Sequence, residues 1–180
     1  ISGGNDGEQR KDGDYLDHDQ RYARTDEFLE VVRKVWTEEQ PFDHLGTFYQ
    51  AQNAFSAIKP LQQPHLPVYF GGSSQAALEV AGKHADVFAL WGESLEQTRE
   101  TIARVRAEAA RHGREIQFSV SFRPIIADTE EAAWAKADAI LTTARQRIER
   151  SGPVIASKPQ SVGAQRLLDT VAQGERVDER

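Results

Sequence analysis

Hydrophobic residues recur at helical spacing in four stretches of the chain. They return every three or four positions, which is the pattern of a helix with one buried face. Thr25 is a suitable N-cap for the first stretch, and Ser94 for the third, which Gly113 would end. The predicted helices are Tyr22–Trp36, Gln75–Lys83, Ser94–His112 and Thr129–Arg150.

Three short apolar runs lie before the later helices: Val68–Phe70, Ala85–Trp91 and Ile116–Ala127. Short buried strands that alternate with helices of ten or more residues indicate parallel βαβ units. The pattern predicts an α/β fold and leaves two architectures open, an open doubly wound sheet and a (β/α)8 barrel.

The remaining segments lack this periodicity. Residues Gly3–Asp19 are mostly polar, so we expect a loop there. The stretch Glu38–Pro67 holds four prolines and one β-like run at Thr47–Gln50, which predicts a long surface excursion. Beyond Ser151 the pattern weakens, although Val162–Val171 is compatible with a short helix.

Composition narrows the class of protein. The 180 residues carry 22 Lys and Arg against 28 Asp and Glu, a formal charge of −6, which argues against nucleic-acid binding. No apolar run is long enough for a membrane span. Without cysteine there is no disulfide framework and no thiolate nucleophile.

Methionine is also absent, and the chain opens on Ile1–Gly4 like a strand entering a turn. We therefore expect an internal portion of a longer protein, with residues 1–180 forming part of one domain.

The best local signal for chemistry is the turn Gly71–Ser74, where an apolar run ends and a helix begins. Glycines let the backbone approach a ligand, and free N–H groups at a helix start favour an anion. A plain glycine turn with a serine cap is the alternative interpretation.

Other candidates are weaker. Arg21 or Tyr22 could offer a guanidinium or a phenol to an anion, or Tyr22 could pack on the core at the start of its helix. Trp91 with Glu93 could line a site at a strand end, the alternative being a buried Trp followed by a solvated Glu. Arg123 is a charge late in the third apolar run. The five histidines show no metal-ligand spacing, so we expect no metal, and His18 is the one worth testing.

Taken in order, three motifs resemble the flavin-dependent monooxygenases of the bacterial luciferase-like family, with the alkanesulfonate monooxygenases as the nearest branch. They are His18–Val31, Pro67–Ser74 and Ala85–Glu93. The resemblance implies a (β/α)8 TIM barrel, of which this chain holds about strands four to seven. Residues 151–180 would then be the insertion that follows the helix after strand seven.

The same resemblance implies that reduced FMN binds at the carboxyl ends of the strands. Gly72, Ser73 and Ser74 would hold its phosphate, Tyr22 would add a hydroxyl, and Ser2 would face the ribityl chain or the ring. The chemistry implied is oxygenation of a sulfonate carbon by a flavin (hydro)peroxide, with Arg123 as the catalytic cation. The Arg and His that alkanesulfonate enzymes carry two apart late in strand seven are here Ser121-Phe122-Arg123, so other organosulfur compounds, long chains or chelates remain open as substrates.

The resemblance further implies a cytoplasmic homo-oligomer supplied by an NAD(P)H-dependent flavin reductase, without nucleic-acid or membrane partners. Two alternatives remain. One is a deazaflavin (F420)-dependent oxidoreductase of the same superfamily, and the other is a non-catalytic α/β fragment. The fragment alone is expected to be inactive, because an incomplete barrel leaves open sheet edges.

Overall fold

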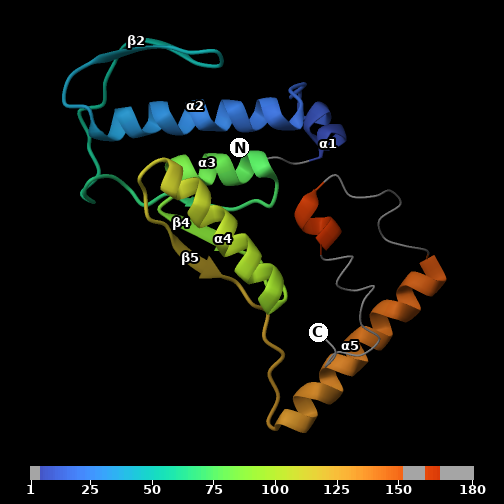
Figure 1. Cartoon of the computed structure of the whole chain (residues 1–180). Coiled ribbons are helices and arrows are strands. Elements are labelled where there is room, and N and C mark those ends of the chain that lie inside the picture. The colour runs from blue at the N-terminus through green and yellow to red at the C-terminus, as the bar shows by residue number, and fades with distance from the viewer. Residues whose placement is uncertain (1–4, 152–160, 167–180) are drawn as a thin grey trace.

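The structure is a computed structural model that describes residues 5–151 and 161–166. Its elements follow the chain in the order shown in Figure 1. They are α1 (Asp6–Lys11), α2 (His18–Thr37), β1 (Phe42–Leu45), β2 (Gln50–Ala54), β3 (Tyr69–Phe70), α3 (Gln75–His84), β4 (Val87–Leu90), α4 (Leu95–Arg111), β5 (Gln117–Val120) and α5 (Glu130–Ser151).

A parallel sheet of order β3-β4-β5 confirms the predicted βαβ units. Tyr69 lies opposite Val87, and Phe88 lies opposite Phe118, so consecutive strands are also neighbours in space. The helices that join these strands, α3 and α4, pack on each other and on one face of the sheet (Figure 1). All three strands therefore end at the same edge, where each is followed by a turn.

The core lies between this sheet and its helices. Phe88 of β4 is almost fully buried against Leu78 of α3 and Val105 of α4. The two helices approach closely at Gly82, where a Cβ atom would lie 2.6 Å from the carbonyl carbon of Glu108. Burial of these side chains supplies most of the stabilisation, at about 25 cal/mol per Å² of apolar surface.

Helix α2 begins earlier than its apolar pattern predicts. Its N-cap is Asp17, whose carboxylate accepts a hydrogen bond from the Gln20 N–H, while the Gln20 side chain accepts one from the Asp17 N–H. The prediction that Thr25 caps this helix is wrong, because Thr25 is buried inside it and its hydroxyl donates to the Arg21 carbonyl. The predicted loop before it also contains a short helix, α1, capped by Asn5.

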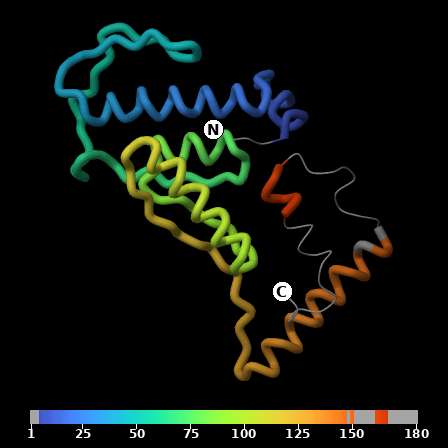
Figure 2. Tube along the Cα trace, in the orientation of Figure 1, coloured from blue at the N-terminus to red at the C-terminus, as the bar shows by residue number. Residues whose placement is uncertain are grey.

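The surface excursion contains the antiparallel hairpin β1–β2, which lies along α2 (Figure 2). Two strands replace the single β-like run expected at residues 47–50, of which residues 47–49 lie in the connection between them and Gln50 begins β2. The Glu27 carboxylate of α2 accepts hydrogen bonds from the Phe48 and Tyr49 N–H groups at 2.9 and 2.8 Å. Burial alone would raise the pKa of Glu27, but these bonds and His44 hold it below its usual value. The hairpin is thus attached to α2 by one carboxylate.

Strand β5 is shorter than the predicted run over residues 116–127. It ends at Val120, and residues 121–130 are exposed. Arg123 therefore lies beyond the strand rather than late in it. Helix α5 then leads away from the layered region (Figure 1), with Trp134 and Ile140 about half exposed. Of the short helix predicted at residues 162–171, residues 162–166 are helical and the rest lie outside the described residues.

Candidate functional site

The turn Gly71–Ser74 joins β3 to α3 at the carboxyl edge of the sheet. Ser74 caps α3, since its Oγ accepts a hydrogen bond from the Ala77 N–H at 3.3 Å. Gly72 has φ of +156°, and a Cβ there would lie 2.6 Å from the Ala77 Cβ and 3.1 Å from the Tyr22 hydroxyl. The turn therefore requires glycine at this position and brings its backbone against both neighbours.

Tyr22 reaches this turn from α2. Its ring is buried and meets the ring of Phe70 edge-on, with 6.4 Å between the centroids. The ring of His18, one helical turn earlier, lies 5.0 Å from the Tyr22 ring between centroids. These contacts orient the Tyr22 side chain so that its hydroxyl lies beside Gly72.

A hollow of about 160 Å³ lies among these groups. Its lining comes from four parts of the chain: His18 with Tyr22, Gly71–Ser74, Trp91, and residues 161–163. Neither the Ser73 nor the Tyr22 hydroxyl makes a hydrogen bond to another described residue. The hollow is smaller than the roughly 300–1,000 Å³ that encloses a whole drug-sized ligand, so it suits one small polar end of a larger molecule.

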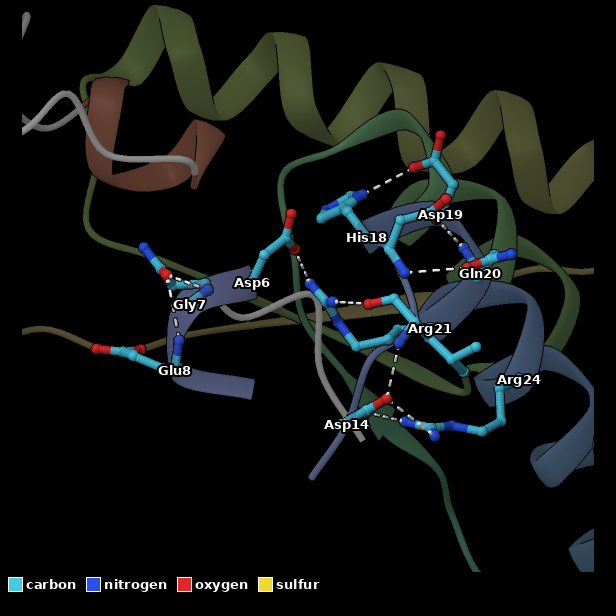
Figure 3. Close-up of polar contacts among 12 residues, drawn as sticks. Asp6, Gly7, Glu8, Asp14, His18, Asp19, Gln20, Arg21 and Arg24 are labelled. Carbon is cyan, nitrogen blue, oxygen red and sulfur yellow. Dashed lines mark hydrogen bonds and ion pairs between the residues drawn. The ribbon is translucent and has the colours of Figure 1, made fainter. Parts of the chain in front are cut away.

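A polar cluster fixes the start of α2 (Figure 3). Arg21 is buried, and its guanidinium donates to the Asp6 carboxylate at 2.8 Å and to the Leu16 carbonyl. Arg24 pairs with Asp14, and its hydrogen bond lowers the pKa of that carboxyl. The suggestion that Arg21 offers its charge to an anion is wrong, because that charge holds α1 and the preceding loop against α2.

A wider groove of about 520 Å³ lies beside the hollow, between α2 and α3. Its charged lining includes Asp19, Asp26 and Glu79. The hydrogen bond from His84, followed by that from Lys83, lowers the pKa of Asp26 to about 2. Because Lys83 is already paired with Asp26, the groove offers an anion mainly carboxylates, and we assign the site to the smaller hollow.

The structure brings together Tyr22, Gly72, Ser73 and Ser74, as the site prediction requires. Ser2 lies outside the described residues, and Arg123 is exposed and does not line the hollow. Their roles stay predictions. The sequence analysis missed residues 161–163, because no periodicity or motif marks them as part of a site some 90 residues away.

The sequence profile of the luciferase-like monooxygenase family matches residues 1–180. Solved structures with a similar fold include a riboflavin lyase with modified FMN and riboflavin, at 24% identity and a TM-score of 0.65. That match covers 75% of this chain and 35% of the lyase.

No helix in the described residues is long and apolar enough to cross a membrane.

Two further structures share the fold. An EDTA monooxygenase from Chelativorans sp. BNC1 is 22% identical with a TM-score of 0.64, over 86% of this chain and 48% of the enzyme. An F420-dependent secondary alcohol dehydrogenase is 21% identical with a TM-score of 0.55, over 60% of this chain and 33% of that one. The chain thus matches between a third and a half of the length of these structures.

The chain belongs to the luciferase-like monooxygenase family. Its three parallel strands and their helices are part of the TIM-barrel fold of that family, and the described residues do not close a barrel.

Proposed function

We propose that this member of the luciferase-like family is a flavin-dependent monooxygenase that holds the phosphate of reduced FMN in the hollow beside Gly71–Ser74. The observation that carries the proposal is the pair of hydroxyls at the N-terminus of α3, those of Ser73 and Tyr22, which make no hydrogen bond to another described residue. A helix N-terminus favours negative charge, and hydroxyls donate short hydrogen bonds to phosphate oxygens.

The other residues support this assignment by shape and chemistry. Gly72 leaves the backbone uncovered where a side chain would collide with Ala77. Trp91, about half exposed, supplies an apolar wall that continues from the hollow along the carboxyl edge. The hollow holds only the phosphate end, so the rest of the cofactor would extend along this edge, where TIM-barrel enzymes bind their ligands.

Reduced flavin, when bound, supplies the reaction with O₂, and the protein's part is to bind, orient and exclude water. Arg123 follows β5 at the same edge, and its charge would attract an anionic substrate. We propose a sulfonate or a related organosulfur compound as that substrate, with reduced FMN delivered by a separate NAD(P)H-dependent reductase. Ser2 would contact the ribityl chain or the ring, and the working enzyme would be a cytoplasmic homo-oligomer.

A second candidate is a deazaflavin-dependent oxidoreductase, which the similarity to the F420-dependent dehydrogenase favours. The phosphate hollow would serve either cofactor. Titration of the full-length protein with reduced FMN and with reduced deazaflavin separates the two, since tight binding of deazaflavin alone would remove FMN from the proposal.

The site itself is tested by the double variant Ser73→Ala, Tyr22→Phe. Each lost hydrogen bond to phosphate costs about 1.5–3 kcal/mol, so FMN affinity should fall at least about a hundredfold. The matched control is Tyr15→Phe with Ser56→Ala, which removes the same atoms from side chains away from the hollow. Equal FMN affinity in both double variants would make the turn a helix cap alone.

A further inference from the structure

Arg166, on the helical turn at residues 162–166, is the charged group that joins this turn to the sheet edge. Its side chain is 16% exposed. The Nε atom lies 3.3 Å from a carboxylate oxygen of Glu93, and a terminal nitrogen lies 3.3 Å from a carboxylate oxygen of Glu100. The same end of the guanidinium is 3.4 Å from the Gln97 carbonyl oxygen. One side chain therefore attaches residues 161–166 to the start of α4.

Glu93 requires such a partner. Its side chain is only 9% exposed, and a carboxylate so far removed from water is costly unless a cation pairs with it. Glu93 also lies two residues after Trp91, which lines the hollow. The ion pair thus forms on the same short loop that supplies one wall of the site.

The turn that carries Arg166 forms another wall. Gly163 is buried, and a Cβ atom there would lie 3.0 Å from the Ser73 Oγ and 3.7 Å from a ring carbon of Trp91. Ser161 and Val162 line the hollow beside it, whereas Arg166 itself does not. The red segment of Figure 1 is this turn, which comes about 90 residues after the turn Gly71–Ser74 in the sequence.

We propose that Arg166 is a positioning residue, which holds residues 161–163 as a wall of the phosphate hollow through its ion pairs with Glu93 and Glu100. Cofactor affinity then depends on an ion pair made outside the hollow. The inference rests on the proposed function, because it takes the ligand of the hollow to be the flavin phosphate. It assigns to residues 161–163, which are distant in sequence, the role of a wall of the phosphate site.

The test compares FMN with riboflavin, which lacks the phosphate, by quenching of flavin fluorescence in the full-length protein. Arg166→Gln should weaken FMN binding about tenfold, because residues 161–163 are no longer held beside the phosphate, and riboflavin binding by less than about twofold. Glu93→Gln should act in the same direction, and Arg166→Lys, which keeps the charge, should recover part of the loss. Arg104→Gln is the control, because Arg104 also pairs with Glu100 but does not line the hollow.

The possible results separate the two proposals. A wild-type protein that does not bind FMN overturns the proposed function and this inference together. If the wild type binds FMN and Arg166→Gln binds it equally well, or loses FMN and riboflavin to the same extent, only the inference is overturned. Thermal unfolding by circular dichroism checks each variant, and Arg166→Lys with Glu93→Gln decides the matter by the same criteria if Arg166→Gln does not fold.

Discussion

The two ends of strand β4 differ in hydrogen bonding. Polar side chains at its amino end are bonded to other parts of the protein, whereas two hydroxyls at its carboxyl end bond to no other described residue. At the amino end, the Asp86 carboxylate accepts hydrogen bonds from the Val68 N–H at 2.8 Å and from the Arg114 guanidinium at 3.0 Å. His65 lies 3.8 Å from the same carboxylate. This single side chain therefore ties together the chain before β3, the start of β4 and the chain before β5.

The neighbouring groups at that end are paired as well. The Asp26 carboxylate lies 2.6 Å from His84 Nε2 and 2.9 Å from Lys83 Nζ, while Arg33 donates to the His84 carbonyl. Two buried nitrogens, His84 Nδ1 and Arg114 Nε, lack a partner among the described residues, but both belong to side chains that are bonded elsewhere. The polar side chains at the amino edge therefore form a network of hydrogen bonds and ion pairs with other groups of the protein.

At the carboxyl end of β4, the Ser73 and Tyr22 hydroxyls face a hollow and make no hydrogen bond to another described residue. Polar groups inside proteins are normally satisfied, so groups left open at a pocket are available to a ligand. In TIM barrels the amino edge serves stability and the carboxyl edge serves function. In this chain, three strands and their helices already show a difference in hydrogen bonding between the two edges.

The largest expected effect tests the amino edge. Asp86→Ala leaves the Val68 N–H and the Arg114 guanidinium without their acceptor, so the free energy of unfolding should fall by about 2–3 kcal/mol. Urea denaturation measures it, with Asp128→Ala, an exposed carboxylate, as the control. A loss no larger than that of the control would show that Asp86 does not tie the strands together.

Gly72→Ala has the next largest expected effect. It tests whether the turn at the carboxyl edge has a fixed backbone shape. The added Cβ would collide with Ala77, so we expect a loss of about 1–2 kcal/mol in stability and at least about tenfold weaker FMN binding. The control is Gly7→Ala, whose Cβ would approach only the movable Asn5 side chain. Unchanged FMN affinity would mean that the turn adjusts freely and does not shape the site.

Acid should affect the amino edge through Asp26. Its folded pKa of about 2 is below the ordinary 3.8, so the folded protein binds this proton more weakly than the unfolded chain does. The stabilisation is therefore complete above about pH 4 and is lost as the pH falls toward 2. Since a third of the side chain is exposed to screening water, we expect about 1 kcal/mol. Chemical denaturation at several pH values should show this loss in the wild type and a smaller one in Asp26→Asn.

The smallest expected effect is on stability at the carboxyl edge, which contrasts with the loss expected at the amino edge. Without flavin, Ser73→Ala combined with Tyr22→Phe should change stability by less than about 0.5 kcal/mol, since neither hydroxyl bonds to another described residue and the buried ring remains. A loss as large as that of Asp86→Ala would place both edges in the same structural role, and differential scanning calorimetry is the measurement.

Local sequence signals predicted the later elements well. Ser94 caps α4 as expected, Ser74 caps α3 as the alternative interpretation of its turn had it, and Gly113 has the positive φ of 64° that ends α4. Capping depends on atoms within one turn of chain, so the pattern contains it. Thr25 misled the prediction because its polarity suggested a cap, whereas tertiary packing buries it inside α2.

The residues of the site also divide into those that local sequence signals predict and those that only tertiary packing brings together. Gly72, Ser73 and Ser74 are neighbours in sequence, and family resemblance added Tyr22, so the structure had only to show that these residues meet. The parallel order of the strands and the glycine turn after β3 also follow from hydrophobic period and glycine chemistry, which act over short distances. Only the tertiary structure decided that Gly163 lies at the same hollow and that Arg166 pairs with Glu93 beside it, because an ion pair across more than 70 residues leaves no mark in local sequence.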